Sequence, residues 1–187
     1  IINYIDKEIM KGDIAEAKLF NPDFIIANMH WGLEYERIPS REQRELADWL
    51  LRQGVDLVIG SHPHVVQPME LRRGKEGVTD RLVVYSLGNF ISNMSREHTD
   101  GGVMVKVVLG RKGLRRYIVS AQYSLIYSSR YKNEQGKEDI RVVPAASWLG
   151  KNQNSSFSVD SALIKYVNNT RLFLKGNNKE VEEYIFE

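Results

Sequence analysis

The fold is decided by residues 23–60, which read DFIIANMHWGLEYERIPSREQRELADWLLRQGVDLVIG. This stretch opens with a short apolar run at residues 23–28 and closes with another at residues 55–59. Such runs are typical of strands that are buried on both faces of a sheet. The segment between them has helical periodicity, with Leu46, Ala47 and Leu50 on one face. The stretch therefore predicts strand, helix and strand, with a right-handed crossover that makes the strands parallel.

Local signals mark both ends of the predicted helix. Ser40 and Gln43 match the S-x-x-Q capping box, in which each side chain satisfies the backbone N–H of the other residue. Gly54 is placed to close the helix in a left-handed conformation. Patterns elsewhere predict a helix ending at residues 14–20, strands at 81–85, 103–109, 114–127 and 139–143, a polar linker at 150–156, and helices at 160–175 and 179–186.

Composition excludes several classes of protein. The 187 residues, 42% hydrophobic and 27% charged, suit one globular domain with an appendage. The absence of cysteine excludes disulfides and thiolate metal sites, and a net charge of +2 is too small to indicate a nucleic-acid partner. No apolar run is long enough to span a membrane. Because the chain opens on Ile1, any signal or membrane anchor is expected upstream of this sequence.

Three of the four histidines follow the two predicted parallel strands: His30 after the first, and His62 and His64 after the second. The carboxyl ends of such strands share the sheet edge where ligands bind. Pro63 is expected to hold His62 extended, so that both nearby imidazoles face one point. Neutral imidazole is a common ligand for divalent metals. The alternative is loop histidines that bond to backbone, and His98 is expected to face solvent.

The carboxylates near these histidines are Glu34 and Glu36, which is too few for a complete two-metal centre. Glu34 is interpreted as a metal ligand, a general acid or base, or a partner that orients a histidine. An exposed loop glutamate is the competing interpretation.

Three motifs resemble those of the CapA-type family of bacterial capsule (poly-γ-glutamate) synthesis proteins. They are HWGLEY at residues 30–35, GSHPHVVQ at residues 60–67 and YSLGNF at residues 85–90. The resemblance covers residues 23–90, and nothing beyond about residue 110 matches it. It implies an α/β fold, a metallophosphoesterase-like sandwich of mixed sheets flanked by helices, of which this chain is the carboxy-terminal part. Residues 1–127 would then belong to that domain, and residues 128–187 would add a strand and a helical extension.

The resemblance also implies a metal site. It makes His30, His62 and His64 metal ligands, with two Zn, Mn or Fe ions in the complete domain. In metallophosphoesterases, further acidic and asparagine motifs for the metals precede these histidines in the chain. Those motifs are missing from this sequence, so this chain alone is expected to bind metal poorly. His30, Glu34 and His64 are the candidate catalytic residues. Trp31 and Asn89 are candidate substrate contacts, although Trp31 could instead pack the loop, and Asn89 could instead form a turn in which Gly88 has a positive φ.

Three functions follow from the resemblance. The first is a metal-dependent hydrolase of a phosphoester or amide, in the synthesis of a poly-γ-glutamate-like envelope polymer. The second is a non-catalytic module that binds an anionic polymer through two basic clusters, for which a solvated turn and a hairpin tip are the competing interpretation. The clusters are Arg72-Arg73-Lys75 and Arg111-Lys112-Arg115-Arg116. The third is a scaffold subunit of an envelope synthesis or export complex. Each implies a location on the extracytoplasmic side of the cell envelope, with a membrane contact only through a segment outside this chain.

Overall fold

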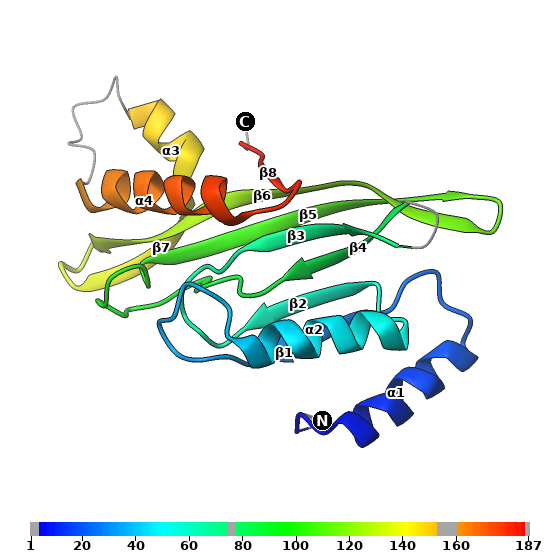
Figure 1. Cartoon of the computed structure of the whole chain (residues 1–187). Coiled ribbons are helices and arrows are strands. Elements are labelled where there is room, and N and C mark those ends of the chain that lie inside the picture. Colours follow the sequence, from blue (N-terminus) through cyan, green and yellow to red (C-terminus); the bar gives the residue numbers. More distant parts are fainter. Residues whose placement is uncertain (1–3, 75–77, 153–160, 186–187) are drawn as a thin grey trace.

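The computed structural model describes residues 4–74, 78–152 and 161–185. Figure 1 shows two sheets in the middle of the molecule, with α1 and α2 on one side and α3 and α4 on the other. The first sheet is mixed, and its spatial order is β1-β2-β4-β3. This sheet and the two helices on its side of the molecule are α1 (Lys7–Leu19), β1 (Ile26–His30), α2 (Arg41–Gln53), β2 (Leu57–Ser61), β3 (Met69–Arg73) and β4 (Thr79–Val84).

The predicted strand–helix–strand unit is present. β1 and β2 are parallel neighbours, and α2 connects them. Ser40 caps α2 in a full capping box with Gln43, and Gly54 closes the helix at a φ of +98°. α2 packs Leu46, Ala47 and Leu50 against Val58 and Val83 of the sheet. This packing fixes the helix on one face, as the hydrophobic periodicity predicts.

β1 departs from the prediction of a strand buried on both faces. Its side chains alternate in exposure, and Ile26 remains 53% exposed. Within the described ranges β2 is the one strand that pairs with β1, so β1 is an edge strand. An edge strand has fewer neighbours to cover it, which explains why its apolar side chains stay in contact with solvent.

The second sheet is built on a long antiparallel hairpin and is closed by carboxy-terminal elements. A single core of apolar side chains joins its inner face to the first sheet and to α4. The described part is therefore a mixed α/β fold with two sheets flanked by helices, as predicted. The elements are β5 (Gly101–Lys112), β6 (Arg115–Lys132), β7 (Glu138–Pro144), α3 (Ala145–Asn152), α4 (Ser161–Asn177) and β8 (Glu182–Glu183).

Three predictions in the carboxy-terminal part need correction or stay open. The helix expected at residues 179–186 is wrong, because Glu182 and Glu183 form β8 and pair with β6, while residue 186 lies outside the described residues. The linker expected at residues 150–156 begins inside α3, and residues 153–156 also lie outside the described ranges. The division at residue 127 stays a prediction, and β6 passes through that point.

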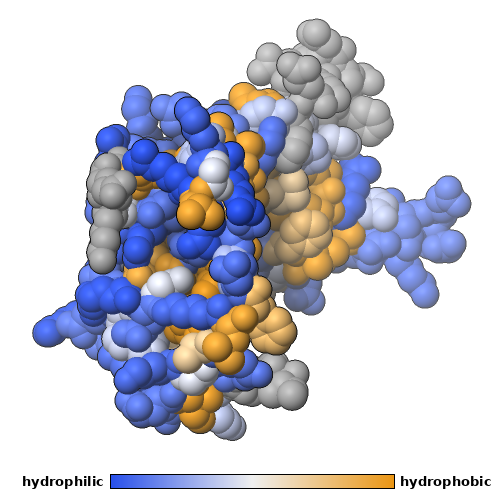
Figure 2. All heavy atoms as spheres, turned by 90° about the vertical axis from the view of Figure 1, so that its right-hand side faces the viewer, coloured by the Kyte–Doolittle hydropathy of each residue, from blue (hydrophilic) through white to orange (hydrophobic). Residues whose placement is uncertain are grey.

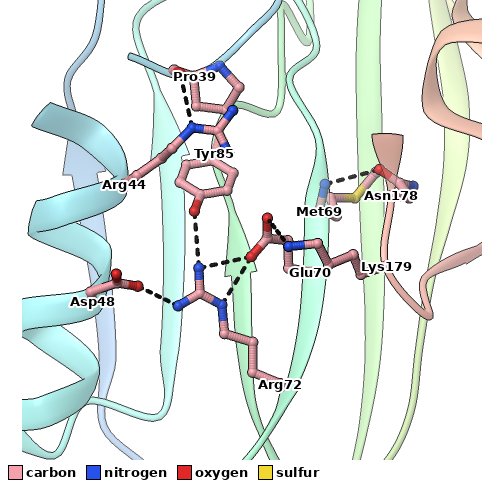
Figure 3. Close-up of polar contacts among 9 residues, drawn as sticks. All are labelled: Pro39, Arg44, Asp48, Met69, Glu70, Arg72, Tyr85, Asn178 and Lys179. Atoms are coloured by element: carbon pink, nitrogen blue, oxygen red, sulfur yellow. Dashed lines mark hydrogen bonds and ion pairs between the residues drawn. The ribbon is translucent and has the colours of Figure 1, made fainter. Parts of the chain in front are cut away.

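A polar network fastens β3, which sequence patterns did not predict, to the elements around it. Arg72 of β3 donates to Glu70 at 2.7 Å, to the Tyr85 hydroxyl at 3.0 Å and to Asp48 of α2. Lys179 donates to the other oxygen of Glu70 at 3.1 Å. Figure 3 shows Arg72 between the carboxylates of Asp48 and Glu70, with Lys179 beyond Glu70. The network therefore ties α2, β3 and the segment after α4 together.

The end of the molecule at the amino termini of β1 and β2 carries exposed apolar side chains. Figure 2 views this end and shows hydrophobic side chains gathered between hydrophilic ones. Leu19, the last residue of α1, and Phe20, which caps it, are 85% and 81% exposed. In the described ranges no helix combines the length and the hydrophobicity that crossing a bilayer requires. The histidines lie at the opposite ends of these strands.

Candidate histidine site

The three predicted histidines meet at the carboxyl ends of β1 and β2. In the parallel register His30 lies opposite Ser61, and the Trp31 N–H donates to the Ser61 carbonyl at 3.1 Å. This register brings the His30 and His62 rings to a centroid distance of 4.5 Å. The His62 and His64 rings are 6.1 Å apart. The crossover thus gathers side chains more than 30 positions apart in sequence, as the sheet-edge argument predicts.

The backbone of the histidine loop is not extended, so the expected effect of Pro63 is wrong. His62 has a φ of +104° and His64 a φ of +62°. Proline disfavours the α region for the residue before it, but it does not prevent a positive φ there. Conformations of this kind cost on the order of 1–3 kcal/mol and persist where surrounding contacts hold them. One such contact is the bond from the Tyr35 N–H to the Pro63 carbonyl, at 2.8 Å.

Asn89 orients His64. The side-chain amide nitrogen of Asn89 donates to the Thr99 carbonyl at 3.0 Å, which leaves its Oδ1 facing His64 Nδ1, also at 3.0 Å. Because this oxygen can only accept, Nδ1 of His64 carries the proton. In neutral His64 the lone pair is then on Nε2. The preceding Gly88 has a φ of +72°, as the turn interpretation expects, and the contact of Asn89 with His64 adds a role that neither interpretation contained.

Replacing Asn89 by alanine is expected to release the tautomer of His64. The loss of one hydrogen bond of about 1 kcal/mol would shift the ratio of Nδ1–H to Nε2–H by about fivefold. Imidazole ¹⁵N shifts measured by NMR report this ratio directly. Asn93→Ala changes an exposed asparagine of the same loop and is the control, with no expected shift. An unchanged His64 tautomer in Asn89→Ala would contradict the assigned orientation.

Glu34 and Tyr35 lie on the open side of His64. Glu34 Oε1 is 4.0 Å from His64 Nε2, and its side chain is 48% exposed. The Tyr35 ring stacks on the His64 ring at 6.1 Å. Desolvation, followed by the hydrogen bond and charge of Glu34, raises the pKa of Tyr35, and Arg96 opposes this rise. Glu34 thus lies at the limit of ion-pair distance from His64 Nε2.

Two buried glutamines hold the site loops, and sequence reasoning assigned neither of them this role. Gln67 is fully buried, and its Nε2 donates to the Glu36 carbonyl at 2.8 Å. Gln43 donates to Gln67 Oε1 at 2.9 Å while its own Oε1 caps Ser40. The loops after β1 and β2 are therefore tied to the start of α2. The capping box could have indicated this role of Gln43. A capping glutamine uses its side-chain oxygen at the helix start, so its amide N–H₂ can donate to another residue.

Trp31 is a packing residue that also borders a cavity. It is 4% exposed, and its Nε1 donates to the Tyr85 carbonyl at 2.8 Å. A cavity of about 450 Å³ adjoins it, lined among others by His30, His62 and Leu33. The geometry matches the packing alternative, and substrate contact by Trp31 stays a prediction. His30 and His62 both line this cavity.

The fourth histidine is outside this group. His98 is partly buried rather than facing solvent, which corrects the expectation. Burial, together with the charge of Arg37, lowers its pKa. The charged groups that act on it are Arg37, Glu97, Asp100 and Lys165, and none of them belongs to the histidine site.

The gathered histidines do not form a complete metal cage. Throughout residues 4–74, 78–152 and 161–185, no three His, Asp or Glu side chains are placed to hold one ion. A structural or catalytic zinc site needs at least three such ligands. The described residues thus offer paired imidazoles and one oriented lone pair, and not a full coordination shell.

The chain is similar to known capsule synthesis proteins. Residues 2–94 match the family model described as "Bacterial capsule synthesis protein PGA_cap". The chain is 35% identical over 115 residues to "PGA biosynthesis protein CapA" of Bacillus subtilis (strain 168), a match that covers 62% of the chain and 28% of that protein. It is 35% identical over 107 residues to "Capsule biosynthesis protein CapA" of Bacillus anthracis, covering 57% and 24%. The chain thus matches about a quarter of the length of these relatives.

Proposed function

The chain belongs, through residues 2–94, to the CapA-type family of bacterial capsule synthesis proteins, and on that premise we propose that it acts in the biosynthesis of a capsule polymer. Two curated relatives carry capsule or PGA biosynthesis in their names. An anionic polymer of the poly-γ-glutamate kind is the proposed substrate, and the cell envelope is the proposed location. Partners in an envelope synthesis complex belong to the same proposal.

We further propose that the histidine site is part of a metal-dependent hydrolase-like centre. The observation that carries this proposal is the convergence of His30, His62 and His64 from two strands on the ligand-binding edge of the sheet. Bound Zn, Mn or Fe ions would supply a Lewis acid and an activated water for attack on a phosphoester or amide. The described residues fit such ions only in part, so further ligands would have to come from outside them.

The chain's own residues have definable tasks in this proposal. His64 presents the Nε2 lone pair and accepts a proton there, while Asn89 keeps the other ring nitrogen protonated. Glu34 Oε1 lies 4.0 Å from this nitrogen and is the carboxylate that faces it. His30 and His62 face the cavity, where they bind and orient a polar group of the substrate or a metal ion.

Divalent metal is expected to bind weakly, through His30 and His62. Titration with Zn²⁺, followed through the imidazole resonances, should move both rings. His62→Asn, which tolerates the positive φ at this position, should weaken binding by more than about tenfold. His98→Ala is the matched control and should leave the titration unchanged. If no imidazole responds, or if both variants behave alike, the metal-centre proposal fails.

A non-catalytic polymer-binding or scaffold role is the alternative. The arginine clusters that it would use are partly engaged within the fold. Arg111 pairs with Asp23 at 3.1 Å, Arg116 donates to the Pro22 carbonyl at 2.8 Å, and Arg73 pairs with Glu180 at 3.6 Å. Groups that already have partners offer less to a polyanion, which favours the histidine site as the functional centre.

A further inference from the structure

An arginine with free donors stands beside the histidine site. Arg96 lies in the loop between β4 and β5 and is exposed. Its guanidinium stacks over the ring of Tyr35, with Cζ 3.9 Å from the ring centroid. Stacking on an aromatic face fixes the plane of a guanidinium while its N–H donors at the edge stay available.

Two short bridges connect Arg96 to His64. Tyr35 is the first, because its ring contacts both the Arg96 guanidinium and the His64 imidazole. The second runs from His64 through Asn89 to the Thr99 carbonyl. Thr99, which is fully buried, in turn donates to the Arg96 carbonyl from its N–H at 3.1 Å and from its hydroxyl at 2.6 Å. Arg96 is thereby held at a fixed place relative to the oriented imidazole.

The loop that carries Arg96 is itself anchored. Ser92 N–H donates to the Ser128 hydroxyl at 3.2 Å, and Arg130 donates to the Asn93 carbonyl at 2.6 Å. Both anchors come from β6. These bonds fasten the loop that presents Arg96 to the second sheet, and a binding residue needs such support.

The acidic neighbours of Arg96 are engaged elsewhere. Glu97 pairs with Lys165 of α4 at 3.4 Å. Glu34 faces His64 Nε2. Among the described residues no carboxylate lies within ion-pair distance of the Arg96 guanidinium. A guanidinium that is positioned, exposed and not neutralised by the fold is suited to bidentate recognition of an external oxyanion.

We propose that Arg96 binds an anionic group of the substrate, a carboxylate or a phosphoryl group, next to His64. This inference deepens the proposed function and rests on it for the identity of the site. The anion would sit against the donor edge of the guanidinium while the reacting part of the molecule reaches His64. A polymer that carries a carboxylate on every unit and a phosphoester both offer such a group.

Anion titrations of the protein test this proposal. Inorganic phosphate and a short γ-linked glutamate oligomer are titrated separately at constant ionic strength, with the imidazole resonance of His64 as the readout. At least one anion should shift His64, and Arg96→Gln should weaken its binding by about tenfold, as expected for loss of a charge-assisted bidentate contact. If Arg96→Gln weakens the binding of phosphate alone, the site recognises a phosphoryl group. If it weakens the binding of the oligomer alone, the site recognises a carboxylate.

Arg141→Gln is the matched control, because Arg141 is also exposed and also stacks on an aromatic ring, Tyr131, at 5.0 Å. Affinity in this variant should stay within about twofold of the unmodified protein. The inference is overturned if neither anion shifts His64, or if both arginine variants behave alike. A Zn²⁺ titration separates this outcome from failure of the metal centre: Arg96→Gln should leave the response of His30 and His62 intact.

Discussion

Gly60→Ala is expected to lower the free energy of unfolding by about 3 kcal/mol, because a side chain at this position has no room. A Cβ on Gly60 would lie 2.1 Å from the Tyr85 carbonyl oxygen and 2.4 Å from Trp31 Nε1. Those two atoms form the buried hydrogen bond, 2.8 Å long, that fixes the indole beneath the site. Relief of the clash must separate them, which adds an unsatisfied buried donor to the cost of overpacking.

Urea unfolding measures this loss, and Gly12→Ala provides the opposite control. Gly12 lies inside α1, and a Cβ there would meet nothing within 4 Å. Alanine at an open helical position should therefore stabilise by up to about 1 kcal/mol. The imidazole resonances of His30 and His62 should also move in Gly60→Ala, since Gly60 lies in β2 directly before the histidine loop. Equal midpoints for Gly60→Ala and the unmodified protein would show that the sheet adjusts freely at this point.

Sequence patterns predicted the strand–helix–strand unit because its signals are local. The capping box, the helical periodicity and the closing glycine all act within a few residues of one another. The meeting of three histidines followed from the crossover alone. Their backbone conformation did not follow, because the positive φ of His62 and His64 depends on contacts such as that of Tyr35 with Pro63.

The missed elements depend on partners that are distant in sequence. β3 contains Glu70 and Arg72, whose charged side chains are not typical of a strand in the sequence. Their partners Asp48, Tyr85 and Lys179 become neighbours only in the folded chain. Residues 179–186 have the composition of a helix, but pairing of Glu182 and Glu183 with β6 overrides that local preference. The orientation of His64 by Asn89 likewise joins residues 25 positions apart. Local pattern carries none of this information.

Removal of Arg72 is expected to destabilise the protein by about 3 kcal/mol at neutral pH, because it leaves the Glu70 carboxylate buried with Lys179 alone. Glu70 is 4% exposed. Burial acts to raise the pKa of Glu70, but the hydrogen bonds from Arg72 and Lys179 outweigh it, and the pKa is lowered from its usual 4.5. Burial acts to lower the pKa of Arg72, but the hydrogen bonds to Asp48 and Glu70 outweigh it and raise the pKa, so the guanidinium stays charged. Arg72→Leu should therefore shift the urea midpoint at pH 7 substantially.

The sign of the pH dependence makes this prediction specific. A carboxyl whose pKa is lower in the folded state contributes stability above its unfolded pKa of about 4.5, and this contribution is lost as the pH falls through the folded pKa. In Arg72→Leu burial should dominate and raise the pKa of Glu70. Protonation of Glu70 near pH 4 should then remove much of the cost of burying its charge. The gap between variant and unmodified protein should thus be larger at pH 7 than at pH 4.

Arg73→Leu serves as the control for this pair of measurements. Its side chain is 64% exposed and pairs with an exposed Glu180 at 3.6 Å, so it should cost no more than about 0.5 kcal/mol at either pH. Glu70→Leu combined with Arg72→Leu should cost less than the two single changes added together, because each single change strands a charge that the double change removes. Additive losses, or a gap that does not narrow toward pH 4, would mean that Glu70 and Arg72 contribute independently, and the fastening of β3 to α2 would then rest on apolar packing alone.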